Sequence, residues 1–218
     1  MKKEIYLLLF AFVVATACDD NRRIDRQEYE SGRKDREVKK INEADVTRKA
    51  YEMGDEISTA AQQELMATLT KAIEEKGVEG AVEFCNLEAL PLLENVGQKY
   101  NATIRRVSNR YRNPNDQPDS DEDMILSAYE YNMENDIKSE PNIQKIDNDQ
   151  VLLYTKAITI PGQLCLNCHG EPGKDIAPEV MAKINQLYPD DKATGHAEGD
   201  LRGMWSIRLP KKEVIRNL

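Results

Sequence analysis

Two cysteines and a histidine form the most distinctive motif of the sequence. Cys165 and Cys168 are separated by two residues, His169 follows directly, and Gly170 comes next. Two thiols at this spacing can each form a thioether with one vinyl group of a haem, and the adjacent imidazole can then bind the iron. The spacing therefore predicts a covalent attachment site for haem c, with His169 as one axial ligand.

Two other chemistries use the same residue types. A redox-active dithiol needs its thiols at the end of a strand and the start of a helix, where helix amides lower the thiol pKa, whereas residues 170–173 (GEPG) predict a loop. A zinc site could combine Cys85 with Cys165, Cys168 and His169, but the second short-spaced ligand pair typical of such sites is missing. Haem attachment is the favoured interpretation, and both alternatives stay open.

The first 18 residues have the composition of an export signal. Two lysines precede an apolar run over residues 5–14, which is short for a membrane span, and small residues lead to Cys18. This order resembles a bacterial lipoprotein signal. We therefore predict a signal peptide at residues 1–17, lipidation of Cys18, and a location on the periplasmic side of a bacterial membrane. An uncleaved anchor helix is the alternative.

The net charge and the composition of the chain limit the kinds of binding partner that are expected. The 218 residues carry a formal net charge of -9, whereas nucleic acid and anionic membrane surfaces attract basic patches. Neither is therefore expected as a partner, and the lipid on Cys18 would hold the protein at a membrane. Residues 18–43 are almost entirely polar or charged, which predicts a tether. Residues 44–218 then form one domain of ordinary size.

Cys85 is a candidate for the second axial position of the iron. It lies on the apolar side of a predicted helix over residues 78–90, where a cysteine is usually a packing residue. The lipid and the haem would use the other three thiols, and thiolate is a known haem ligand. From the residues alone, His196, Met204 and Met133 stay open as alternatives.

Hydrophobic periodicity predicts the elements that position these residues. Apolar and small side chains recur every three to five positions over residues 46–73, which predicts a long helix. Gly77 and Gly80 are expected to interrupt it, and Pro91 to mark either a break in the helix that follows or the first turn of a new one. Strands are predicted at residues 102–108, 142–146, 151–160 and 204–209, with a turn at 147–149 and helices after Ser120 and from Pro178. The strand over residues 151–160 is apolar on both faces, so it is expected to be central, and it leads into the attachment motif.

Arginines in the predicted loop at residues 110–118 and just before it are candidates for binding the anionic propionate groups of haem. Arginine forks bind carboxylates well, which makes Arg106, Arg110 and Arg112 the candidates. Solvated surface arginines are the common alternative.

Four stretches together resemble a bacterial family of c-type haem domains with a PAS-like fold. This family occurs alone in exported proteins and as the extracytoplasmic sensor module of histidine kinases and chemoreceptors. The resemblance covers roughly residues 43–209. The stretches are EFCN at 83–86, RNPN at 112–115 continuing to Pro118, CLNCHG at 165–170, and YP at 188–189 continuing to DLRG at 200–203.

The resemblance implies an α+β fold in which an antiparallel sheet is flanked by helices and preceded by a long N-terminal helix. It also implies a single haem with His169 and Cys85 as axial ligands, and it adds Arg202 to Arg112 as a residue that binds the haem. In this family the position of His196 is more often tyrosine, so competition of His196 for the iron is an open question.

The expected function is that of a redox-responsive or small-ligand-responsive haem sensor. Thiolate favours ferric iron, and reduction or protonation should loosen it. A simple electron carrier for a membrane respiratory chain is the alternative. A peroxidase would need an open iron position and an acid or base near it, so no enzyme activity is expected. A redox or signalling protein is the expected partner, and homodimerisation through the N-terminal helix is a further expectation.

Overall fold

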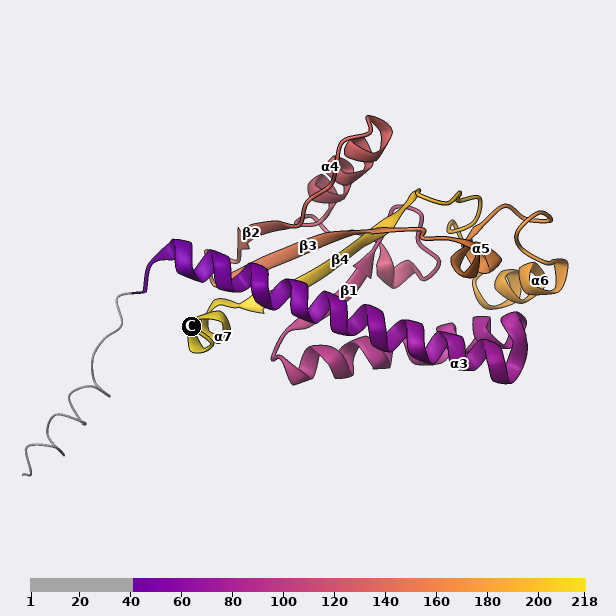
Figure 1. Cartoon of the computed structure of the whole chain (residues 1–218), viewed down its shortest axis with the longest axis horizontal. Helices are drawn as coiled ribbons and strands as arrows, with labels where there is room; N and C mark the ends of the chain where they lie inside the picture. Colours follow the sequence, from indigo (N-terminus) through magenta and orange to yellow (C-terminus); the bar gives the residue numbers. More distant parts are fainter. Residues whose placement is uncertain (1–40) are drawn as a thin grey trace, which may run out of the picture. The chain divides into compact units, whose positions relative to one another are not determined.

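The computed structural model describes residues 41–218, which form a mixed α+β domain. A four-stranded antiparallel sheet has helices on both faces and is preceded by a long helix, as predicted (Figure 1). The assignment to a PAS-like architecture stays a prediction. The predicted signal peptide, the lipidation site Cys18 and nearly all of the predicted tether lie outside the described residues.

The long helix α3 (Glu43–Lys99) consists of two arms joined at Gly77. Gly77 has φ 71° and ψ 177°, a non-helical conformation that glycine adopts readily, and Figure 1 shows the chain reversing its direction there. Asn42 caps the first arm, because its side chain accepts a hydrogen bond of 2.8 Å from the backbone N–H of Asp45. The interruption predicted at Gly77 is confirmed, whereas Gly80 lies inside the second arm.

Pro91 does not break the second arm, contrary to the prediction. A proline inside a helix leaves the carbonyl four residues earlier without its donor. That carbonyl belongs to Leu87, which is 61% exposed, so water can take the place of the missing N–H. Ala89, Leu93 and Val96 are buried in the main core on either side of the proline. Their packing holds this stretch helical in spite of the lost hydrogen bond.

The sheet has the strand order β1-β4-β3-β2. Its strands are β1 (Thr103–Val107), β2 (Asn142–Ile146), β3 (Val151–Thr159) and β4 (Leu201–Pro210), and every neighbouring pair is antiparallel. The predicted turn between β2 and β3 is confirmed, with positive φ at Asp147, Asn148 and Asp149. β3 lies inside the sheet, as predicted from its two apolar faces.

The two faces of the sheet pack against different helices. Ile104, Tyr154 and Trp205 contact the buried side of α3, and the opposite face packs on α4 (Asp123–Glu134) through a smaller cluster. Because successive strand residues alternate between faces, Arg106 shares the α3 side with Ile104. Arg105 faces the side of α4.

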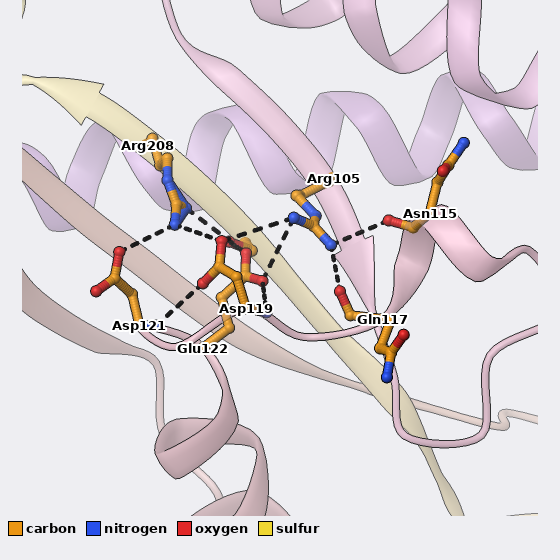
Figure 2. A network of polar contacts seen from close by, with 8 residues as sticks. Arg105, Asn115, Gln117, Asp119, Asp121, Glu122 and Arg208 are labelled. Atoms are coloured by element: carbon orange, nitrogen blue, oxygen red, sulfur yellow. Dashed lines mark hydrogen bonds and ion pairs between the residues drawn. The ribbon is translucent and has the colours of Figure 1, made fainter.

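A polar network attaches the segment before α4 to the sheet (Figure 2). The side chain of Glu122 is fully buried, and its carboxylate accepts hydrogen bonds from Ser206 Oγ at 2.6 Å and from the backbone N–H of Asp119 at 3.0 Å. Arg105 lies 3.5 Å and Arg208 3.6 Å from the same carboxylate. Two strands and the start of α4 are thereby joined through one buried acid.

The remaining short helices are η1 (Pro114–Asp116), α5 (Gln163–His169), α6 (Pro178–Leu187) and α7 (Lys211–Arg216). Both α5 and α6 contact α3, near the turn between its two arms (Figure 1). Within residues 41–218, no helix is long and apolar enough to cross a bilayer.

Candidate functional site

A cavity of about 430 Å³ lies between α3, the sheet and α5. Its volume falls within the range of cofactor sites, roughly 300–1,000 Å³. Much of its wall is apolar, with contributions from Leu65, Met66, Leu69, Ile73, Val82, Ile158 and Trp205. Seven of the predicted site residues line this one cavity: Cys85, Arg106, Arg112, Cys165, Cys168, His169 and Arg202. Arg110, the third arginine predicted for the propionates, is not among the lining residues.

The predicted attachment motif, residues 165–169, lies on helix α5, which begins two residues before Cys165. Cys165 and Cys168 are therefore three positions apart on a helix, which places them on the same side. The predicted loop starts only after the motif, so the strand-to-helix setting of a redox dithiol is present after all. Burial, however, raises the pKa of Cys165 and raises the pKa of Cys168 to about 11. Neither thiol is thus activated in the way that a redox pair requires.

The surroundings of His169 fix which of its ring nitrogens carries the hydrogen. Its Nδ1 lies 2.8 Å from the carbonyl oxygen of Ala193. A carbonyl can only accept, so Nδ1 carries the hydrogen and Nε2 keeps its lone pair. Burial, assisted by Arg202 and Arg112, lowers the pKa of His169 well below its ordinary value. The imidazole is therefore neutral, the form that binds iron.

A buried ion pair between Arg112 and Asp191 contacts both the motif and Ala193, whose carbonyl is the hydrogen-bond partner of His169. Arg112 Nε lies 2.9 Å from Asp191 Oδ1, and Arg112 Nη2 donates to the Cys168 carbonyl at 2.7 Å. The same Asp191 oxygen accepts from the backbone N–H of Ala193 at 3.1 Å. Such contacts behind a ligand fix its orientation. Sequence reasoning missed Asp191 and Ala193, because a pairing across 79 positions has no local signal.

Cys85 reaches the cavity from the second arm of α3. Burial raises the pKa of its thiol, while Arg106 and Arg112 act in the opposite direction. Tyr188 also lines the cavity, and burial and the neighbouring Cys85 raise the pKa of its hydroxyl to about 12. Cys85 thus lines the cavity from α3, whereas the two motif cysteines and His169 line it from α5.

None of the alternative ligands is among the residues that line the cavity. Met204 is buried in the cluster on the α4 side of the sheet, and Met133 lies on α4. His196 is buried in the loop before β4. Within residues 41–218, no three His, Cys, Asp or Glu side chains are grouped so that they could hold one metal ion. The four candidate zinc ligands, Cys85, Cys165, Cys168 and His169, are therefore not arranged as a metal site in the described residues.

One wall of the cavity is cationic. Arg106, Arg112 and Arg202 line it together with the carboxyl of Asp116. The buried Nε of Arg106 has no hydrogen-bond partner in the described part of the chain. Burial, with Arg106 and Arg112 close by, lowers the pKa of Arg202 to about 9. Three guanidinium groups face two carboxyls, Asp116 and the Asp191 that pairs with Arg112, and the net positive charge suits a ligand that carries carboxylates.

A family model described as Tll0287-like matches residues 27–210. The solved structure described as the crystal structure of the cyanobacterial haem protein Tll0287 is 24% identical, and the alignment covers 67% of this chain and 95% of that chain with a TM-score of 0.48. None of the curated proteins matches the chain.

Proposed function

This chain belongs to the Tll0287-like family, and we propose that it is a c-type cytochrome with one haem joined by thioethers to Cys165 and Cys168. The family is named after a protein that is described as a haem protein. One observation carries the proposal: both motif thiols, the imidazole of His169 and the thiol of Cys85 line the same cavity.

The residues around the cavity fit such a group. The apolar side chains of α3 and the sheet would pack against the porphyrin, and the cationic wall with Arg112 and Arg202 would face its propionates. His169 has its Nε2 lone pair available for the iron, and Cys85 offers a sulfur ligand from the second arm of α3. When bound, the haem would supply a one-electron redox couple.

The sensor function rests on how these ligands are divided between elements. Helix α5 holds both attachment thiols and His169, whereas α3 contributes Cys85 alone. Release of the sulfur of Cys85 would leave the haem attached and would uncouple the second arm of α3 from α5. The first arm follows the predicted tether and its lipid anchor at Cys18, so a change in α3 would reach a partner protein near the periplasmic face of a membrane.

Expression in a host with c-type cytochrome maturation tests the proposal. The parent is expected to gain the mass of one haem and to retain it under denaturing conditions. Cys85→Ala should keep the covalent haem but change its visible and electron paramagnetic resonance spectra, whereas Leu87→Ala, an exposed change on the same arm, should not. A colourless parent, or unchanged spectra in Cys85→Ala, would refute the assignment.

Spectra of the reduced protein separate the sensor from the simple electron carrier. A sensor is expected to lose the sulfur ligand on reduction and to exchange electrons slowly. Ligation that is the same in both oxidation states, with rapid exchange, would favour the carrier instead.

A further inference from the structure

Asp116 is a buried acid in the wall of the cavity. The residue is only 7% exposed, and it lines the cavity together with Arg106 and Arg202. Its carboxyl makes no hydrogen bond and no ion pair with any residue that the structure describes. Buried carboxyls in proteins are normally paired or hydrogen-bonded. A partner from outside the chain is therefore indicated.

The backbone around Asp116 is fixed to strand β1. The N–H of Ser108 donates to the carbonyl of Asp116 at 2.9 Å. Arg105 donates through Nη2 to the carbonyls of the residues on either side, Asn115 and Gln117. Because these contacts hold helix η1 on both sides of Asp116, the carboxyl stays at the wall of the cavity.

The charged groups that act on Asp116 are arginines of the sheet. Arg106 and Arg105 lie on β1, and Arg202 lies on β4. Tyr188 faces Asp116 from the segment after α6 and is neutral near pH 7, because burial raises the pKa of its hydroxyl to about 12. Burial outweighs the three arginines and raises the pKa of Asp116 itself. The carboxyl therefore keeps its proton to a higher pH than an ordinary aspartate does.

The carboxylates of a bound haem would meet Asp116 on this wall. In the proposed function the propionates face Arg112 and Arg202, and Asp116 lines the same wall and acts on the charge of Arg202. Arg112 is itself neutralised by Asp191. Two neighbouring carboxylates repel each other, so one of them binds a proton at a pH where a lone carboxyl is ionised. The shared proton then makes the hydrogen bond that Asp116 lacks within the chain.

We propose that Asp116 is a proton-binding site of the cavity, where its carboxyl shares one proton with a carboxylate of the bound haem. This inference rests on the proposed function. When an external one-electron donor reduces the iron, Asp116 and its partner take up one proton from the solvent. When an acceptor removes the electron, the proton returns to the solvent. The added electron and the added proton cancel in charge, which couples the redox state of the iron to pH.

The reduction potential of the holoprotein, measured against pH, is the first test. A bound proton adds positive charge near the iron and favours the reduced state, so the potential should fall as pH rises above the ordinary aspartate value of about 3.9. One proton per electron changes the redox equilibrium tenfold per pH unit, which is about 59 mV for a one-electron couple. The comparison uses the pH range in which the visible spectrum is constant, so that ligation by Cys85 does not contribute.

Two asparagine variants separate Asp116 from other acids. Asp116→Asn keeps the size of the side chain but cannot exchange a proton, and it should lose the dependence of the potential on pH. Asp121→Asn is the matched control, because that carboxyl is 41% exposed and pairs with Arg208. Its potential should depend on pH as that of the parent does.

Infrared difference spectra give a second readout that the parent alone provides. Reduction of the parent at an electrode should add the carbonyl band of a protonated carboxylic acid, which shifts in deuterium oxide and is absent from Asp116→Asn. A potential of the parent that does not depend on pH, a dependence that persists in Asp116→Asn, or an acid band equal in both redox states would overturn the inference. If the proposed function itself fails, the parent and both variants lack covalent haem, which is a separate result.

Discussion

The buried ion pair between Arg112 and Asp191 is predicted to hold the motif on α5 in place, and replacing Arg112 tests this role. Replacement of Arg112 by leucine leaves the Asp191 carboxylate without its cation in a site where the two side chains are only 11% and 4% exposed. Removal of one partner of a buried pair costs about 3–5 kcal/mol. For a chain of this size, 1 kcal/mol corresponds to about 2–4 °C, so Tm should fall by roughly 6–20 °C.

Urea unfolding of the holoprotein, followed by far-ultraviolet circular dichroism, measures this loss. The pair between Arg48 and Asp45 is a matched control, because its side chains are 65% and 35% exposed. Arg48→Leu should therefore cost about 0–1 kcal/mol. Arg112→Lys keeps the charge but loses the planar fork that contacts both Asp191 and the Cys168 carbonyl, and it should fall between the two.

A double-mutant cycle completes the test. Because Arg112 and Asp191 are in contact, replacing both by leucine should cost less than the sum of the two single changes. If Arg112→Leu costs no more than Arg48→Leu, or if the two losses simply add, the ion pair does not hold the motif and the reasoning is wrong.

Three further predictions concern the fold and its pH dependence. A methyl group on Gly54 would lie 2.2 Å from Tyr154 Cγ, so Gly54→Ala should cost about 1–3 kcal/mol through overpacking; an unchanged Tm would contradict this. Glu122→Ala removes a buried acceptor and should cost about 1–3 kcal/mol in urea unfolding, against about 0–1 kcal/mol for the more exposed Asp121→Ala; equal losses would argue against the network in Figure 2. Burial raises the pKa of Asp116, so its ionisation opposes folding: stability should decline as pH rises from the unfolded value of about 3.9, and Asp116→Asn should remove this decline in unfolding measured from pH 3 to 7.

Much of the fold follows from local patterns. The spacing of apolar residues predicted both arms of α3 and all four strands, and the DND sequence predicted the turn between β2 and β3. These predictions succeed because helix and strand periodicity are properties of neighbouring residues. Pro91 is the exception, since the packing of the arm that contains it outweighs the local preference.

Part of the candidate site also follows from local sequence, and part follows only from the tertiary structure. The sequence by itself predicted an attachment motif, because two thiols and an imidazole within five residues are a local arrangement. Only the tertiary structure decided that Cys85 and the arginines line the cavity of that motif. It also decided the tautomers, since the hydrogen of His169 is set by Ala193 and that of His196 by Arg110. Such contacts join residues far apart in the chain, and they exist only once the helices and the sheet have packed together.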